Sequence, residues 1–194
     1  ECSPSAAASR DAAYVPDRTA SIVISEIMYN PPSDHRQGEF IELYNRGAAA
    51  VNVGGWSFAD GISYTIPTGT SIAPGARLVV AQDPAYITAN YPGVSGVVGG
   101  YGGSLSNSGE LIRLEDATGN MADEVDYHPG GDWPRMADGL GSSLELINPA
   151  MDNGAGSSWA ASDESNKGQW TTYTHTGVYY GVGPLITPEI HMNL

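Results

Sequence analysis

Residues 22–56, IVISEIMYNPPSDHRQGEFIELYNRGAAAVNVGGW, decide the fold of this chain. The stretch begins with an extended apolar segment and turns at a Pro-Pro pair. A second extended segment opens at Gly38 and ends at Asn45-Arg46-Gly47, and a third, Val51-Asn52-Val53, leads through two glycines to Trp56. Short apolar runs bounded by Gly, Pro and Asn are typical of β-strands joined by turns. The stretch therefore predicts three successive strands.

The alternation of side chains along these strands predicts which of them face a core. Residues 22–28 divide into two alternating sets, 22/24/26/28 and 23/25/27, and give a strand with one strongly apolar face. In the next strand Ile41 and Leu43 form the core face. Phe40 and Tyr44 then lie on the second face.

Length and composition favour one β-rich domain with additional segments. A sandwich of two antiparallel sheets needs about 100 residues, so 194 residues suit one domain with substantial arms. Hydrophobic residues make up 41% of the chain, which is enough for a real core. The 25 glycines and 13 prolines disfavour helices and favour many short strands joined by tight turns.

Further strands and one short helix are predicted downstream. Strands are predicted at residues 62–66, 77–81, 110–115, 121–127 and 143–146. Asp83 followed by Pro84 predicts the start of a helix that runs to Asn90. The glycine-rich residues 93–103 are interpreted as a loop, and they contain no phosphate-binding glycine pattern.

The order of these motifs resembles the lamin tail domain, an immunoglobulin-like β-sandwich. The resemblance is carried by GEFIELYN (38–45), V-N-V and G-G-W (51–56), Ile66-Pro67, Ala73-Pro74-Gly75, SLSNSGELIRL (104–114) and DEVDY (123–127). It implies a fold that serves mainly in binding and scaffolding, and it makes Trp56 a core tryptophan that anchors the two sheets. Animal lamins also carry a coiled-coil rod. Nothing in this sequence has heptads, so the resemblance implies no nuclear-scaffold role.

We therefore expect an all-β, immunoglobulin-like β-sandwich with one short helix, a flexible N-terminal arm and a strand-rich C-terminal extension. The arm is residues 1–20, the lamin-tail-like sandwich 21–163 and the extension 164–194. Strong strand character at residues 169–180 marks the extension, which is too short for a sheet domain of its own. We expect it to dock on the sandwich or on a partner chain.

Charge and cysteine content exclude some partners and favour a location. The 22 acidic and 8 basic residues give a net charge of −14, and no basic run is present that would neutralise nucleic-acid phosphates or anionic lipid. No apolar run approaches the roughly 20 residues of a membrane span. The single Cys2 allows no intrachain disulfide, and an unpaired thiol suits its setting better than a lipidation site does. Scarce lysine and turns rich in Ser, Thr, Gly and Asn favour an extracellular or cell-surface bacterial protein.

No set of residues predicts catalysis, so we expect no enzyme, no catalytic residue and no bound cofactor. The four histidines are widely separated, with no zinc-ligand spacing: His35, His128, His175 and His191. No nucleophile elbow and no catalytic cysteine signature occurs. Glu39 and Glu42, three residues apart on one strand, project to opposite faces and cannot act as a glycosidase pair.

Calcium is the one metal that the sequence leaves open. Asp123, Glu124 and Asp126 lie close together on a predicted strand, and Asp116 or Asp132 would add further oxygen ligands. Calcium takes roughly six to eight oxygens, but no D-x-D-x-D-G loop is present. We favour a solvated acidic strand and assign no metal ligand.

A set of aromatic residues forms a candidate surface for a sugar or a protein partner. Its members are Tyr101, Trp133, Trp170, Tyr173, Tyr179 and Tyr180. Aromatic residues are enriched in interface hot spots, but alternate members of such a series also fill cores and shield sheet edges. The stretch 170–180 is the stronger candidate because no sheet for it is evident in the sequence.

The function that these expectations favour is that of a non-catalytic extracellular structural or adhesion module, which acts through sheet-edge and surface contacts. The N-terminal arm or the stretch 170–180 would pair with a protein partner or a second copy by strand addition, as in a surface assembly or filament. The alternative is an accessory domain of a larger secreted hydrolase, one that binds carbohydrate or calcium. A protein that continues well past Leu194 would favour the alternative.

Overall fold

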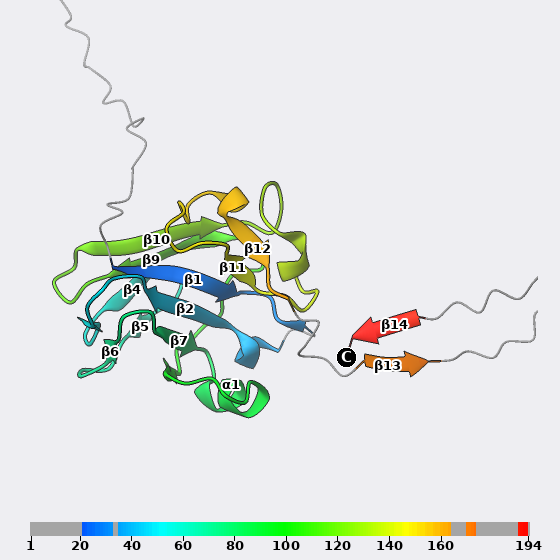
Figure 1. Ribbon diagram of the computed structural model, residues 1–194, viewed down its shortest axis with the longest axis horizontal. Helices are drawn as coiled ribbons and strands as arrows, with labels where there is room; N and C mark the ends of the chain where they lie inside the picture. The colour runs from blue at the N-terminus through cyan, green and yellow to red at the C-terminus, as the bar shows by residue number, and fades with distance from the viewer. Residues whose placement is uncertain (1–20, 33–34, 164–169, 174–189, 194) are drawn as a thin grey trace, which may run out of the picture. The chain divides into compact units, whose positions relative to one another are not determined.

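Figure 1 shows the computed structural model of the chain, which describes residues 21–32, 35–163, 170–173 and 190–193. The chain divides into two compact units, residues 1–161 and 162–194, and each is described here by itself. The arm expected at residues 1–20 lies outside the described residues, and so does Cys2.

The larger sheet of the first unit has six strands. In spatial order they are β12 (Trp159–Ala161), β11 (Leu144–Leu146), β1 (Ile22–Met28), β2 (Phe40–Asn45), β7 (Arg77–Ala81) and β8 (Val97–Gly99). Neighbouring strands pair antiparallel, except that β8 pairs with β7 in parallel.

The second sheet has four antiparallel strands and faces the first (Figure 1). In spatial order they are β10 (Met121–Tyr127), β9 (Glu110–Glu115), β4 (Ser57–Asp60) and β5 (Tyr64–Thr65). A small ladder joins β3 (Val51–Asn52) to β6 (Ser71–Ile72). The prediction of an all-β, immunoglobulin-like sandwich is confirmed, and the strands predicted at 77–81, 110–115 and 121–127 have the predicted bounds.

The helical elements whose full bounds are described are α1 (Pro84–Asn90) and the single turns η2 (Arg36–Gly38), η3 (Arg135–Ala137) and η4 (Gly156–Ser158). The Asp83 carboxylate accepts hydrogen bonds from the backbone N–H groups of Ala85 and Tyr86, each at 3.0 Å, and so caps α1 as predicted. No helix among these is long and apolar enough to cross a membrane.

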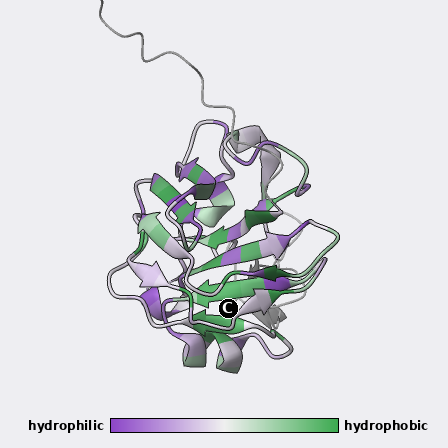
Figure 2. Cartoon of the chain, turned by 90° about the vertical axis from the view of Figure 1, so that its left-hand side faces the viewer, coloured by the Kyte–Doolittle hydropathy of each residue, from purple (hydrophilic) through white to green (hydrophobic). Residues whose placement is uncertain are grey.

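The main core lies between the two sheets, where the strands carry most of the hydrophobic colouring of Figure 2. A second, smaller cluster lies on the other face of the six-stranded sheet, beneath α1. Its buried members are Met28, Phe40, Val79, Ala81 and Ile87. Ile41 and Leu43 face the main core and Phe40 the second cluster, as the alternation in β2 predicted.

The strict alternation expected in β1 is wrong because the strand contains a bulge between Ile24 and Glu26. Ile22 and Ile24 face the main core before the bulge, and Ile27 and Tyr29 face it afterwards. One extra residue shifts the side-chain pattern by one position. The bulge thereby keeps apolar side chains in the core along the whole strand.

The expectation that Trp56 anchors the core needs correction. Trp56 is only partly buried and packs against the main cluster, because it stands before the first residue of β4, at the rim of the sheet. Trp133 and Trp159 are the buried tryptophans, with exposed fractions of 7% and 4%. Their ring centroids lie 5.8 Å apart. The aromatic anchor thus comes from the C-terminal part of the sandwich.

Residues 93–103 were expected to form a loop, but they contain β8. Gly99 makes this strand possible, because its φ of +146° is strained for other residues and a Cβ there would lie 1.9 Å from the Ala81 carbonyl oxygen. The glycines that suggested a loop instead let a parallel strand approach β7 closely.

The second unit contains one described antiparallel pair, β13 (Trp170–Tyr173) and β14 (Ile190–Asn193). Trp170 pairs with Asn193 and Tyr173 with Ile190. A strand was predicted over residues 169–180, and a partner strand at 190–193 was not. Docking of this unit on the sandwich or on another chain remains a prediction.

Asp123 of β10 joins the two sheets and the C-terminal segment of the sandwich. Its Oδ2 accepts hydrogen bonds of 2.7 Å from the backbone N–H of Ile24 and from Nδ2 of Asn153. The backbone carbonyl of Asn153 accepts a bond from Trp159 Nε1 at 2.8 Å. Since β11 pairs with β1 only at Glu26 and Ile27, the Asp123 carboxylate bonds an N–H of β1 that has no partner in β11.

Replacing Asp123 by alanine is expected to lower the free energy of unfolding by about 3 kcal/mol, because buried donors on Ile24 and Asn153 lose their acceptor. The matched control is Asp126→Ala, since the Asp126 side chain lies on the same strand and is 61% exposed. Urea unfolding of both variants measures the difference. Equal, small losses of stability in the two variants would show that the Asp123 bonds contribute little.

Candidate binding site at one end of the sandwich

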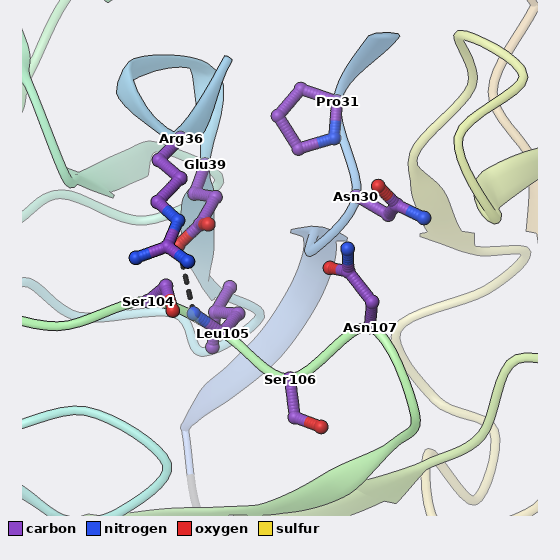
Figure 3. A pocket seen from close by; sticks show the side chains of 8 residues that line it. All are labelled: Asn30, Pro31, Arg36, Glu39, Ser104, Leu105, Ser106 and Asn107. Carbon is purple, nitrogen blue, oxygen red and sulfur yellow. Dashed lines mark hydrogen bonds between the residues drawn. The ribbon is translucent and has the colours of Figure 1, made fainter. Parts of the chain in front are cut away.

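A polar pocket of about 410 Å³ opens where β1 ends, β2 begins and the loop before β9 passes (Figure 3). Its lining residues are Asn30, Pro31, Arg36, Glu39, Ser104, Leu105, Ser106 and Asn107. Figure 3 shows Arg36 beside Glu39 on one wall and the side chains of Asn30 and Asn107 close together on the other. Both walls therefore present hydrogen-bonding groups to the space between them.

Glu39 is the buried charged group of this pocket, with 2% of its surface exposed. Its Oε2 accepts a hydrogen bond of 2.8 Å from the backbone N–H of Leu105. Burial raises the pKa of the Glu39 carboxyl to about 7, although the Leu105 bond and the charge of Arg36 act in the opposite direction. Near neutral pH the Glu39 carboxyl is therefore protonated in part of the molecules and ionised in the rest.

The loop at residues 104–109 is held in place by bonds to several elements. Besides the Leu105–Glu39 bond, the Ser106 N–H donates to Oε1 of Glu110 at 2.6 Å, and the Tyr127 hydroxyl donates to the Ser106 carbonyl at 2.7 Å. The Gly109 N–H donates to the same carbonyl at 3.2 Å. These bonds fix the wall of the pocket before any ligand arrives.

Three buried tyrosines, Tyr29, Tyr101 and Tyr127, lie in the main core, and two of them interact with Glu39 and Glu110. Tyr29 and Tyr127 stack with ring centroids 4.8 Å apart. Burial raises the pKa of Tyr101, and the charges of Glu39 and Glu110 raise it further. The buried hydroxyls of Tyr29 and Tyr101 have no hydrogen-bond partner in the described part of the chain. The core next to the pocket is therefore unusually polar and only partly satisfied.

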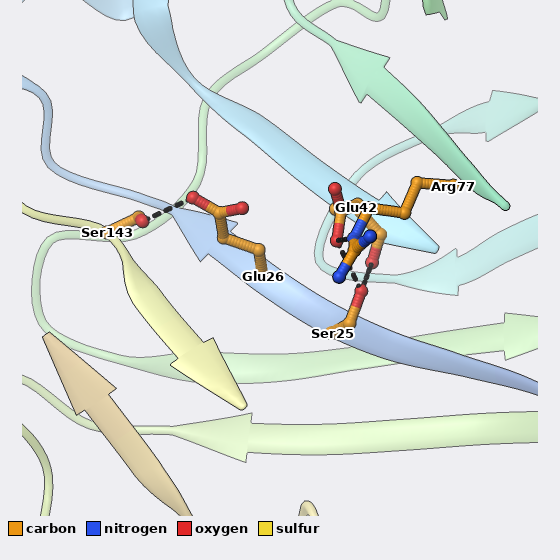
Figure 4. A network of polar contacts seen from close by, with 5 residues as sticks. All are labelled: Ser25, Glu26, Glu42, Arg77 and Ser143. Atoms are coloured by element: carbon orange, nitrogen blue, oxygen red, sulfur yellow. Dashed lines mark hydrogen bonds and ion pairs between the residues drawn. The ribbon is translucent and has the colours of Figure 1, made fainter. Parts of the chain in front are cut away.

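Glu42 lies on the opposite face of β2 from Glu39, as predicted, so the two carboxylates share no cleft. Oε1 of Glu42 accepts bonds from Ser25 Oγ at 2.7 Å and from Arg77 Nε at 3.0 Å (Figure 4). Burial raises the pKa of Glu42, and these two partners lower it. Glu42 thus cross-links β1, β2 and β7 on the outer face of the sheet.

The acidic residues proposed as a calcium cluster do not meet. Asp123 is buried and points inward, whereas Glu124 and Asp126 point outward from β10. Glu124 instead accepts a bond from Arg113 at 3.1 Å. No group of three or more His, Cys, Asp or Glu side chains within the described ranges is arranged to hold a metal ion.

The aromatic candidates are also separated. Tyr101 and Trp133, expected on the surface, are buried at 4% and 7% exposure because both pack into the main core. Trp170 and Tyr173 lie in β13 of the second unit, and Tyr179 and Tyr180 lie outside the described residues. The first unit therefore has no aromatic platform formed by these residues.

From the sequence, Glu39 was considered only as half of a catalytic pair, and the pocket was not predicted. Glu39 does precede an apolar strand directly, which is a signal of burial. The other lining groups are Asn30, Pro31, Arg36 and residues 104–107. These two parts of the chain meet because of the overall fold, so no local sequence pattern marks the pocket. The arrangement supplies amide, hydroxyl, guanidinium and carboxyl groups for hydrogen bonding, without a nucleophile paired with a base.

The stability of the protein is expected to fall as pH rises from about 4.5 to about 7. The pKa of Glu39 is raised from 4.5 to about 7, so the folded state keeps a proton that the unfolded state loses. This contribution is complete below pH 4.5 and is lost as pH passes about 7. Asp123, whose pKa burial raises from 3.8 to about 6, adds a similar loss at lower pH.

Urea unfolding at intervals across this range measures the effect. Glu39→Gln keeps an acceptor for Leu105 and removes the titration, so it should flatten the profile by roughly 2–3 kcal/mol. Glu115→Gln, at a partly exposed position on β9, is the matched control for the exchange of Glu for Gln itself. An unchanged slope in the Glu39 variant would contradict the assignment.

Comparison with known families accounts for most of the sandwich. The Lamin Tail Domain family model matches residues 16–129, more than half of the 194 residues. None of the curated proteins compared is significantly similar to the chain. The matched segment contains β1 to β10 and every lining residue of the pocket, while β11 and β12 follow it. Lamin tail domains are non-catalytic immunoglobulin-like modules that often mediate protein interactions. The chain belongs to the lamin tail domain family.

Proposed function

We propose that this protein is a non-catalytic structural or adhesion module of the bacterial cell surface or the extracellular space, and that it joins a second copy of itself through the β12 edge of the six-stranded sheet. The observation that carries this proposal is the position of its exposed apolar side chains. Among the described residues the large exposed hydrophobics are Met136, Leu140, Ile147 and Met151, with exposed fractions of 38–65%.

All four of these side chains flank β11, and none lies in the segment that matches the family. Two precede the strand and two follow it. β11 is followed in the sheet by β12, which has no further strand beside it in the described part of the chain. Ile147 pairs with Ser158 immediately before β12, and Met136 lies in η3, which contacts β12. Exposed apolar side chains near an edge strand favour association with another polypeptide.

The other sheet edges are less suited to strand addition. On the far side, residue Gly102 forms a bridge with Ser63 next to β5, so the chain after β8 closes the gap between the sheets. On β10 the outward side chains include Glu124 and Asp126, and charged residues on an edge discourage pairing. The β12 edge carries Ala160 and Ala161 instead.

A second copy fits this edge because the apolar residues stand at both ends of β11. An antiparallel β12–β12 contact about a two-fold axis would set the Leu140 end of one copy against the Ile147 end of the other. The net charge of −14 opposes this contact at low salt, so association should strengthen as salt screens the repulsion. The acidic composition and scarce lysine support the extracellular setting.

Ala161→Pro is expected to abolish self-association without unfolding the sandwich. The Ile147 N–H donates to the Ser158 carbonyl, so in an antiparallel ladder Ser158 and Ala160 bond to β11 and the Ala161 N–H faces outward. Proline removes that donor and is tolerated on an edge. Ala161→Ser, which keeps the N–H, is the matched control.

Light scattering and sedimentation of the full chain at low and high salt measure the outcome. The wild type and Ala161→Ser should exceed the monomer mass of 20.3 kDa, increasingly so at high salt, while Ala161→Pro stays monomeric. A wild type that remains a monomer at all concentrations, or a proline variant that associates equally well, would contradict the proposal.

A further inference from the structure

We propose that the pocket between Asn30 and Asn107 binds a neutral hydroxylated ligand, namely a single hexose or N-acetylhexosamine unit. The site is separate from the β12 edge, since its lining residues are Asn30, Pro31, Arg36, Glu39 and residues 104–107. It would give the module a ligand in addition to its protein contact.

The size of the pocket suits one sugar ring. Pockets for small molecules have volumes of about 300–1,000 Å³, and this one, at about 410 Å³, lies near the lower limit. Six of its eight lining residues are polar, with Pro31 and Leu105 the apolar exceptions. Such a lining would leave an apolar ligand facing unpaired polar groups, whereas a ring with many hydroxyls pairs with them.

The charges of the pocket favour a neutral ligand. Among the lining residues that the structure describes, Arg36 carries the one guanidinium and Glu39 the one carboxyl, and the two lie beside each other (Figure 3). An anion that approached Arg36 would meet the Glu39 carboxyl, which is charged in part of the molecules near neutral pH because its pKa is about 7. A cation that approached Glu39 would meet Arg36. A ligand without net charge can form hydrogen bonds with both Arg36 and Glu39, and its binding is not weakened by electrostatic repulsion.

The polar groups are held in place by hydrogen bonds within the protein. Asn30 Nδ2 donates to Oδ1 of Asp138 at 2.8 Å, which fixes the Asn30 amide. Glu39 is held by Leu105, and Ser106 by its bonds to Glu110 and Tyr127. A pocket whose groups are already ordered loses little entropy when it binds a ligand. Such ordering of the polar groups distinguishes a preorganised binding site from an incidental depression in the surface.

Asn107 is the lining residue best suited to a test. It is exposed, so its replacement disturbs no buried contact, and its amide faces the cavity beside Asn30 (Figure 3). Ser108, the next residue, is also exposed and does not line the pocket. Asn107→Ala and Ser108→Ala thus form a matched pair on one loop.

The experiment is an NMR titration of the ¹⁵N-labelled full chain with glucose, galactose and N-acetylglucosamine, up to about 10 mM, since a ligand of this size binds with a Kd on the order of 1 mM. We expect saturable shifts of the Leu105 amide and its loop neighbours for at least one sugar. Asn107→Ala should weaken binding about five-fold, as expected for one lost hydrogen bond. Ser108→Ala should bind like the wild type.

Charged sugars decide the ligand class. Glucuronic acid and glucosamine, titrated in the same way, should bind more weakly than the neutral sugar of best affinity. The proposal is overturned if no neutral sugar shifts the Leu105 region, if shifts appear only elsewhere on the chain, or if Asn107→Ala binds unchanged. Tighter binding of either charged sugar overturns the assignment to a neutral ligand.

Discussion

The buried carboxylate of Asp123 is the interaction on which the sandwich depends. It stands on β10 of the smaller sheet, yet it bonds the backbone of Ile24 in the larger sheet and the side chain of Asn153 in the C-terminal segment. Asn153 in turn orients Trp159, whose ring packs on Trp133. One side chain therefore connects both sheets to the residues that complete the fold after the family segment ends.

The polar residues of the motif GEFIELYN, Glu39, Glu42 and Asn45, also stabilise the fold. Glu39 holds the loop before β9, and Glu42 links β1 to β7 through Ser25 and Arg77. The buried Asn45 donates to the carbonyls of Ala49 and Ile72 and accepts from Gly47. Burying acids raises their pKa values and ties stability to pH. In this sandwich, hydrogen bonds from buried polar side chains hold the loops and neighbouring strands in place, which apolar side chains could not do.

Local patterns predicted most of the fold, and contacts between distant segments account for the rest. The strands at 110–115 and 121–127 follow from alternation around a tight hairpin, and the helix from Asp83 and Pro84 follows from capping chemistry. The bulge in β1, the strand at Gly99 and the partners of Asp123 depend on residues far away in sequence. The pocket belongs to this second class, because two separate parts of the chain line it and neither carries a motif for it.

The role of Asp123 in joining the two sheets is tested most directly by the titration of its carboxyl group. The ¹³C chemical shift of its carboxyl carbon, followed with pH in the labelled full chain, should show a midpoint of about 6, because burial raises the pKa from 3.8. The amide proton of Ile24 should shift with the same midpoint, since it donates to this carboxylate. A midpoint at or below 3.8, with an Ile24 amide that does not follow it, would show that Asp123 is solvated and that the two sheets are joined by something else.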